Sequence, residues 1–557
     1  MLEKLAGSLT TSDGKRLRPF AYLLLFIMCI AFYMPGFTTL PPTDRDESSF
    51  AQASKQMIET GNYTDIRLQK EPRYKKPIGI YWLQSSIVRL LNPQHLNEIW
   101  AYRVPSFVGA TVAVLMTAAL GALLFTPETG LLAAIMLAAC VLLNVEARLA
   151  KTDAALLGSI MVAMYALARA YLGRASRWGT PFLFWSALAC GVLIKGPIIL
   201  LPILGVLVWS KTTDKNILWF RALRPLPGLI YALILIAPWF VAISMQSHGA
   251  FIQQSAGNDM LHKLWQGQNR GILPPGLHLL ALPIVFFPFS LFVLFALPDI
   301  WKNRHEAAVK FCLGWAVPTW IIFELSLTKL PHYVLPAYPA LALLTAHFLL
   351  QGFPSVSHCE RRWPVALIVT LWLMIGTGFA VAFAFLPSFV DDKWMLPQII
   401  AGAILVIAQA CALFTLPRKK FASVAILAAG SFLFMTTTFA STLPNLQHIW
   451  MSREITQQAA ALHPCVHSQL VSVGYHEPSL AFLAGTDTIM AMSGAEAAED
   501  LKQDACRIIV INAKQQSAFL DAFNGAPLQP QSSGTLNGLN SGHGATTALT
   551  LYLLPKP

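Results

Sequence analysis

Residues 20–47 read FAYLLLFIMCIAFYMPGFTTLPPTDRDE, an apolar run followed closely by four consecutive charged side chains, Asp44 to Glu47. The run is long enough to cross a bilayer as a helix, which takes about 20 apolar residues. Charged groups this close to hydrocarbon are costly to desolvate and generally serve a function. The stretch therefore predicts a membrane protein whose first helix leads directly into a functional polar loop.

The composition extends this prediction to the whole chain. Of its 557 residues, 55% are hydrophobic and 12% are charged, with a mean hydropathy of +0.54, whereas soluble domains carry about 25% charged residues. We expect the first helix to be uncleaved because Pro35-Gly36-Phe37 follows it in place of a small-residue cleavage site, with a signal peptide as the alternative. Thirteen apolar spans are expected, at 20–36, 104–125, 129–146, 153–173, 180–194, 196–210, 226–245, 276–298, 309–327, 331–351, 364–386, 397–416 and 421–442.

The distribution of charge predicts how these spans are oriented. The net charge is +12, and the basic residues gather in the connections between alternate spans. With the N-terminus in the cytoplasm, every cytoplasmic connection except the short turn at 126–128 is basic. This is the positive-inside pattern of membrane proteins. It places the C-terminus on the outer side of the membrane.

The chain divides into two predicted domains. Residues 1–443 hold the spans and a long first outer loop at 37–103, whereas charge returns in residues 444–557. In the loop, Asp46–Thr60 has helical periodicity, and Ile78–Leu91 is apolar but too short to span, which suits a helix lying at the membrane interface. The expected fold is mainly α, a polytopic membrane bundle of about 13 transmembrane helices with a small C-terminal periplasmic α/β domain.

Strand-like and helix-like runs alternate in the C-terminal domain. We expect strands at 470–473, 488–492, 507–511 and 548–554, helices at 453–462, 495–502 and 513–523, and a loop at 526–545, which is rich in Gly, Ser, Pro and Asn. Cys465 and Cys506 could form one disulfide in an oxidising compartment. The domain carries no Gly-rich phosphate loop and no metal-ligand Cys/His spacing, so we expect it to cap the bundle or to recognise a partner.

Five separate segments bring polar side chains to the predicted outer face. They contain Asp44, Asp46, Glu47, Lys75 and Lys76; Glu146, Arg148, Lys151 and Asp153; Lys195; Asp259, His262, Lys263, Arg270 and His278; and Lys329, His332 and Tyr333. Each side chain has a structural alternative, as a helix cap, a snorkelling cation, a satisfied histidine or part of an interfacial aromatic belt. Their gathering on one face is what favours a functional site.

Acids and bases at a lipid boundary suit one class of chemistry. A carboxylate can act as a general base toward a hydroxyl, and cationic side chains can hold a phosphate and stabilise its charge as it leaves. The chain has no nucleotide-binding motif. This combination favours displacement of a lipid-linked phosphate, a donor already activated, by an acceptor hydroxyl.

The motifs of this face resemble those of the membrane glycosyltransferases with the GT-C fold. They are D-E-x-x-[FY] from Asp46, K-P-[IP]-x-x-Y-W from Lys76, T-D at 152–153, K-G-P at 195–197, P-P-G-x-x-x-L-x-L-P ending at Pro283 and K-L-P-H-Y-x-L-P-x-Y-P-A at 329–340. The likeness is greatest to the aminoarabinose–lipid A transferase type (ArnT) within the protein O-mannosyltransferase-like superfamily. It extends over nearly the whole bundle and the outer domain.

The resemblance implies an inverting transfer of a sugar from a polyprenyl-phosphate donor to lipid A, lipopolysaccharide or another envelope glycan, on the periplasmic face of a bacterial inner membrane. It implies a monomer that binds no nucleic acid and needs no cofactor or metal. The catalytic candidates are Asp46, as the general base, Glu47 and Asp153. The candidates for binding the donor phosphate or substrate are Lys76, Arg148, Lys195, His262, Lys263, Arg270, Lys329, His332 and Tyr333.

Two departures from the aminoarabinose type leave the sugar open. That type has D-E-T-R-[YF] and E-K-P, where this chain has Ser49 and Lys75. A protein O-mannosyltransferase is one alternative, and a transporter or flippase of a lipid-linked solute is another. The transporter alternative predicts charged groups at mid-span, but the spans are nearly free of them apart from Glu324 near a span end. A non-enzymatic envelope assembly protein would leave the clustered acids and bases unexplained.

Overall fold

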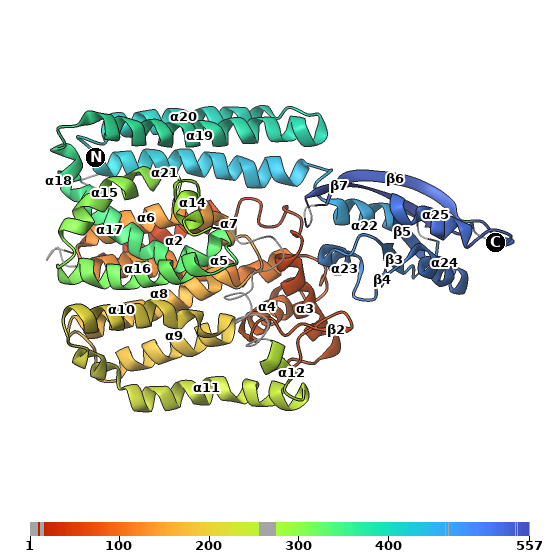
Figure 1. Cartoon of the computed structure of the whole chain (residues 1–557), viewed down its shortest axis with the longest axis horizontal. Coiled ribbons are helices and arrows are strands. Elements are labelled where there is room, and N and C mark those ends of the chain that lie inside the picture. The colour runs from red at the N-terminus through yellow and green to blue at the C-terminus, as the bar shows by residue number, and fades with distance from the viewer. Residues whose placement is uncertain are drawn as a thin grey trace.

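The computed structural model describes residues 9–11, 16–254, 274–462, 464–465, 467–540, 542 and 544–555. A bundle of roughly parallel helices forms most of the molecule, and a small α/β domain is attached at one end of it (Figure 1). The first loop lies between the two (Figure 1). The mainly α architecture with a C-terminal sheet domain is therefore confirmed.

Helices occupy every one of the expected spans. They are α2 (Pro19–Tyr33), α5 (Trp100–Leu124), α6 (Pro127–Ala139), α7 (Val141–Glu146), α8 (Asp153–Tyr171), α9 (Gly179–Lys195), α10 (Leu200–Thr213), α11 (Pro225–Gln246), α14 (Leu277–Val285), α15 (Ser290–Lys302), α16 (Ala307–Leu325), α17 (Tyr338–Gln351), α19 (Arg362–Asp391), α20 (Leu396–Thr415) and α21 (Lys420–Thr437). Within the described residues, nine helical segments are long and apolar enough to cross a membrane, and α2 and α6 are shorter apolar helices. The protein is a membrane protein, and the count of thirteen crossings stays a prediction.

Small residues let α5 and α8 pack closely at the centre of the bundle. A Cβ atom on Gly109 of α5 would lie 2.4 Å from the Ala154 carbonyl oxygen, and one on Gly158 of α8 would lie 2.8 Å from the Gly109 carbonyl oxygen. Glycine at these positions allows the two backbones to touch, as in other membrane helix pairs. This packing fixes the position of α8, which begins at Asp153.

Helices α9 and α10 form a hairpin that turns at Gly196. Gly196 has φ +70°, a conformation that glycine adopts without strain. Lys195, before the turn, forms an ion pair with Asp153 at the start of α8, and Asp214, after α10, forms one with Lys310 at the start of α16. The two ion pairs lie at opposite ends of the bundle, as expected of two separate antiparallel spans.

Two expected single spans are each broken in two, which corrects the prediction. The span predicted at 276–298 consists of α14 and α15, separated at Phe286–Phe289, and the span at 129–146 consists of α6 and α7, separated at Cys140. Pro288 lacks an N–H group and cannot continue a helix. The Val141 N–H donates to the carbonyl oxygen of Phe287 at 3.0 Å, so the two breaks lie against each other.

The first loop folds into α3 (Asp46–Thr60), a short hairpin of β1 (Arg67–Leu68) and β2 (Glu71–Pro72), and α4 (Gly79–Leu91). The helix predicted at Asp46–Thr60 is confirmed at both ends. Helix α4 buries Gly79 against the backbone of α9, where a Cβ atom would lie 2.7 Å from Leu193. Its other side exposes Trp82, Leu83 and Leu90, as suits a membrane boundary.

The C-terminal domain contains α22 (Met451–Leu462), β3 (Leu470–Val473), α23 (Pro478–Ala484), β4 (Ile489–Ala491), α24 (Gly494–Gln503), β5 (Ile508–Asn512), α25 (Ala513–Asp521), β6 (Gln531–Asn540) and β7 (Ala545–Leu553). The sheet order is β4-β3-β5-β7-β6, with β4, β3 and β5 parallel and β7 and β6 antiparallel.

The prediction of a loop at 526–545 is wrong, because strand β6 occupies much of this segment. The sequence QSSGTLNGLN is poor in the β-branched and aromatic residues typical of strands. Pairing with β7 along its length and packing against α22, where Gly538 lies under Met451, stabilise the strand despite its composition. The Leu539 N–H also donates to the His448 carbonyl oxygen at 2.7 Å.

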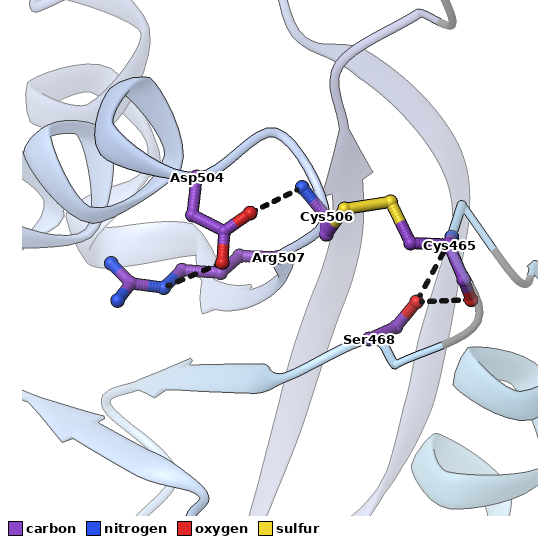
Figure 2. The surroundings of a disulfide bond; sticks show 5 residues. All are labelled: Cys465, Ser468, Asp504, Cys506 and Arg507. Carbon is purple, nitrogen blue, oxygen red and sulfur yellow. Dashed lines mark hydrogen bonds and ion pairs between the residues drawn. A yellow bond between two sulfur atoms is a disulfide. The ribbon is translucent and has the colours of Figure 1, made fainter.

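A disulfide joins Cys465 and Cys506 in this domain, with their Cα atoms 5.4 Å apart (Figure 2). Nearby, Ser468 hydrogen-bonds within the Cys465 turn, and Asp504 accepts from the Cys506 N–H at 2.9 Å (Figure 2). The bond ties the segment before β3 to the segment before β5.

Helix α23 docks the C-terminal domain on the first loop. Phe482 is fully buried in a cluster with Ala51, Val88 and Tyr102 of the membrane domain. Around it, Lys55 Nζ donates to the Phe482 carbonyl oxygen at 3.2 Å, and the Asn97 side-chain amide donates to the Leu483 carbonyl oxygen at 3.0 Å. The first loop is therefore held on two sides, by the bundle and by the outer domain.

Candidate active site

Glu47 and Arg103 form a fully buried ion pair beneath the first loop. Arg103 Nε lies 2.8 Å from Glu47 Oε1, and both side chains have an exposed fraction of 0%. Arg103 also donates to the carbonyl oxygens of Phe37 and Leu40 at 2.8 and 2.9 Å, and to that of Pro41 at 3.1 Å. The pair pins the chain between the first helix and α3, because every nitrogen of the guanidinium has a partner.

The Glu47 carboxylate also joins the first loop to the connection before α8. It accepts from the Ala150 N–H at 3.0 Å and from the Thr43 N–H at 2.9 Å. Burial alone would raise the pKa of the Glu47 carboxyl, but Arg103 and these backbone N–H groups outweigh burial and lower that pKa. The carboxylate is thus charged, saturated with donors and sealed from solvent.

Five titratable side chains from three segments form a charged cluster at this end of the bundle. Lys151 Nζ lies 3.0 Å from Glu146 Oε1, and Lys195 Nζ lies 2.5 Å from Asp153 Oδ1. The His332 ring lies between the two carboxylates, 3.7 Å from Glu146 through Nδ1 and 3.9 Å from Asp153 through Nε2. The cluster is a continuous chain of alternating acids and bases.

Asp46 lies at the edge of this cluster. Its side chain is exposed at the start of α3, and it is one of the acids that act on Lys151. Burial would lower the pKa of the Lys151 ammonium, but Glu146, Asp153 and Asp46 together raise it above its ordinary value. Across the described part of the chain, the Asp46 carboxylate accepts no hydrogen bond, so it is accessible to a reacting group.

The other candidates from the K-L-P-H-Y motif lie next to the cluster. Lys195 Nζ lies 5.8 Å from the centre of the Tyr333 ring, and the rings of His332 and Tyr333 are 5.1 Å apart. Lys329 is buried and its Nζ donates to the Ser326 carbonyl oxygen at 2.7 Å. Lys76 is half-buried in the segment between β2 and α4.

Arg148 has a different place from the one predicted for a donor ligand. Its guanidinium is fully buried and donates to the carbonyl oxygens of Pro35 at 2.9 Å, Asn144 at 2.6 Å and Phe32. It also stacks on the Phe439 ring, 4.4 Å from its centre. These contacts tie the end of α2 to α7, so Arg148 stabilises the bundle, and its role as a donor ligand stays a prediction.

The remaining candidates, His262, Lys263 and Arg270, and Asp259 beside them, lie outside the described residues. The described residues on either side of them are anchored at the same end of the molecule. The Phe251 ring packs edge-on against the Tyr74 ring of the first loop, with the ring centres 5.8 Å apart. Glu324, the acid near a span end, accepts from the Gly276 N–H at 2.7 Å and from the Trp320 side chain at 3.1 Å. Glu324 therefore holds the start of α14.

Three residues of this network were not predicted from the sequence to belong to the site. Glu146 and Lys151 were recognised as polar residues of the outer face but not chosen, and Arg103 was not singled out. Arg103 carried a usable signal, because an arginine at the start of an apolar span needs a buried partner. Among the described residues, no group of three His, Cys, Asp or Glu side chains is arranged to hold a metal ion.

The sequence is similar to those of known glycosyl-transferring proteins. The model of the family described as dolichyl-phosphate-mannose-protein mannosyltransferase matches residues 75–241. The chain is 27% identical to the undecaprenyl phosphate-alpha-4-amino-4-deoxy-L-arabinose arabinosyl transferase of Enterobacter sp. (strain 638), over 63% of this chain and 61% of that protein. It is 24% identical to an uncharacterized protein of Aquifex aeolicus (strain VF5), over 84% and 87%. The match spans about three fifths of the length of the curated arabinosyl transferase.

The solved structure of ArnT from Cupriavidus metallidurans bound to undecaprenyl phosphate superposes on nearly the whole molecule. The TM-score is 0.74 at 17% identity, covering 96% of this chain and 98% of that one. The apo structure of the same protein gives a TM-score of 0.70 at 16% identity. The chain therefore has the fold of this ArnT structure, and part of its sequence is similar to that of the Enterobacter arabinosyl transferase.

Proposed function

We propose that this protein is an inverting glycosyltransferase that moves a sugar from a polyprenyl-phosphate donor to lipid A, lipopolysaccharide or another envelope glycan. The observation that carries the proposal is the charged cluster of Glu146, Lys151, Asp153, Lys195 and His332 beside an accessible Asp46. The ArnT fold and the likeness to undecaprenyl phosphate-aminoarabinose transferases support this reading.

The geometry suits a single displacement at the anomeric carbon of the donor sugar. The acceptor hydroxyl oxygen attacks that carbon and forms the new glycosidic bond. The bond between the carbon and the phosphate oxygen breaks, and the polyprenyl phosphate leaves with the bonding electrons. Asp46 takes the hydroxyl proton, because its carboxylate is exposed and without a hydrogen bond in the described part of the chain.

The cations of the site would bind and stabilise the departing phosphate. Lys76, Lys195, Lys329 and His332 are assigned to this role, with Tyr333 beside them and with His262, Lys263 and Arg270 as further candidates. Asp153 holds Lys195 in place. Glu47 has no solvent access, so we assign it the positioning of Asp46, its neighbour in α3.

The proposed orientation puts the site and the C-terminal domain in the periplasm of a bacterial inner membrane. The disulfide between Cys465 and Cys506 supports this side, because such bonds persist in oxidising compartments. The α18 (Pro354–Ser357) connection, which is followed by Arg361 and Arg362, lies at the opposite end of the bundle (Figure 1).

The Asp46→Asn variant tests the proposed base. Transfer from a polyprenyl-phosphate sugar in membranes should fall by about 10²- to 10⁴-fold, the usual contribution of a general base. The amount of protein should not change, because the side chain is exposed. Glu71→Gln, an exposed acid of the same loop, is the matched control and should retain activity. Full activity in Asp46→Asn would show that another group accepts the proton.

Mass spectrometry of lipid A, core and surface glycans from cells with and without the protein tests the function itself. A mass difference on one glycan would identify both sugar and acceptor. The matched mannosyltransferase family makes a protein acceptor the second candidate. Sugar loss from envelope proteins alone would select that candidate, and no difference in any fraction would contradict transferase function.

A further inference from the structure

Arg73 is a buried arginine of the first loop whose charge has no partner among the described residues. Its exposed fraction is 7%. In the part of the chain that the structure describes, its Nε and Nη1 atoms are buried without a hydrogen-bond partner, and it forms no ion pair. An arginine is always charged, and a buried charge is costly unless it is paired. Arg73 therefore calls for an anion that the described protein does not supply.

The other two buried arginines at this end show what a satisfied guanidinium looks like here. Arg103 is paired with Glu47 and with three backbone carbonyl oxygens. Arg148 donates to carbonyl oxygens from all three of its nitrogens. Arg73 makes one described side-chain contact, a stacking of its guanidinium on the Phe50 ring at 4.8 Å. Stacking fixes the plane of the group and leaves its N–H edges for hydrogen bonds.

Two acids of the loop, Asp65 and Glu47, are already engaged. Asp65 accepts from Arg67 at 2.7 Å and from the Tyr74 hydroxyl at 2.8 Å. Glu47 is saturated by Arg103 and backbone N–H groups. Neither of these two carboxylates could pair with Arg73 without leaving one of its present partners.

The position of Arg73 puts it in the candidate site. Phe50, on which it stacks, lies one helical turn after Asp46 on α3, and residues four apart lie on the same helix face. Lys76 follows three residues later in the chain. Helix α4 comes next, and its exposed Trp82, Leu83 and Leu90 mark the lipid boundary. Arg73 thus contacts the helix that begins with the proposed base, and it precedes a proposed phosphate ligand by three residues.

We propose that Arg73 binds the phosphate group of the polyprenyl-phosphate donor together with Lys76. The assignment rests on the proposed function for the identity of the donor. Guanidinium groups match phosphate oxygens in geometry and form short, charge-assisted hydrogen bonds with them. The bound phosphate gives the N–H groups of Arg73 the acceptors that they lack in the described structure. The same contact keeps the phosphate charge stabilised after the sugar has left.

Arg73→Met tests this with purified protein and undecaprenyl phosphate as the probe. Methionine keeps the length and apolar stem of the side chain and removes the charge. The affinity for undecaprenyl phosphate should fall by about tenfold or more, the effect of losing a hydrogen bond to a charged group. The unfolding temperature without lipid should stay the same or rise, because an unpaired buried charge has been removed. A residue that merely supports the fold would give the opposite, a lower unfolding temperature.

Arg89→Met is the matched control, because Arg89 is an exposed arginine that contacts the Tyr63 ring and donates to its hydroxyl. It should bind undecaprenyl phosphate as the wild type does. Should Arg73→Met not yield folded protein, Arg73→Lys takes its place. Lysine keeps the charge but lacks the planar fork, so affinity should fall several-fold.

Unchanged affinity in the Arg73 variant, or no binding by the wild type, overturns the assignment. Inorganic phosphate at the same concentration should raise the unfolding temperature of the wild type less than undecaprenyl phosphate does. An equal increase would overturn the assignment of a lipid-linked ligand. Transfer assays separate this from the proposed function. A wild type that binds undecaprenyl phosphate through Arg73 but transfers no sugar leaves the assignment standing and refutes the transferase. If the protein transfers sugar but Arg73→Met binds undecaprenyl phosphate normally, the transferase function stands and the assignment of Arg73 is refuted.

Discussion

Asp46 and Glu47 are adjacent acids with opposite environments. Asp46 is exposed beside Lys151, and Glu47 is sealed against Arg103 with an exposed fraction of 0%. The side chains of successive residues point to different sides of a helix, so the first turn of α3 delivers one carboxylate to the site and one to the interior. One pair of residues thereby supplies both the proposed base and the anchor that holds it.

Glu47→Gln should destabilise the protein by about 3–5 kcal/mol at neutral pH, because it leaves the buried Arg103 charge unpaired. Thermal unfolding in detergent would measure this loss of stability. Glu128→Gln, which changes an acid in the first turn of α6, is the control. The same loss in both variants would contradict a special role for the ion pair.

This stabilisation also has a defined pH range. The folded-state pKa of Glu47 is lowered, so the ion pair contributes fully above the ordinary value of 4.5 and is lost as the pH falls from there toward the folded-state pKa. The stability difference between wild type and Glu47→Gln should therefore be constant between about pH 6 and 8 and shrink below about pH 4.5.

The sequence carried part of this residue-scale picture. The acids, bases and histidines of the outer connections could be recognised together, because the predicted spans determine which connections lie on the same side of the membrane. Their individual partners could not, because Arg103 meets Glu47 and Ala150 only through tertiary packing. Arg148 looked like a site cation for the same reason: its carbonyl partners at Phe32 and Pro35 are more than 100 residues away in the chain.

At the scale of elements, helical periodicity was a reliable guide and composition was not. Helix α3 could be predicted to the residue because a full amphipathic pattern begins at its acidic first turn. Strand β6 could not, because its Gly, Ser and Asn residues favour a loop and only pairing with β7 makes it a strand. The breaks at Cys140 and Phe286–Phe289 likewise follow from contacts between two distant segments.

Phe482→Ala should loosen the contact between α23 and the first loop. A buried Phe→Ala change costs about 3–5 kcal/mol, and here the loss falls on docking of the outer domain. Hydrogen exchange at the amides of Ala51 and Ala53 in α3 should accelerate accordingly. Leu520→Ala, which alters an exposed side chain of α25 in the same domain, should leave that exchange unchanged. Equal protection in both variants would contradict docking through Phe482.

For the whole molecule, the positive-inside pattern predicts which end faces the cytoplasm. Cys359 is partly exposed in the basic connection between α18 and α19. A membrane-impermeant maleimide should label it in inverted vesicles and not in intact spheroplasts. Thr60→Cys, at the exposed end of α3, should show the reverse. Labelling of Cys359 from outside would reverse the proposed orientation.

The docking of Phe482 has a consequence for how the protein is made. Its pocket is built by Ala51, Val88 and Tyr102, which leave the ribosome early, whereas Phe482 leaves near the end. Until then these three residues of the newly inserted chain lack the side chain that covers them. A polypeptide cut short before α23 would leave this apolar surface exposed, so we expect the first loop to reach its final packing only after the whole chain has been made.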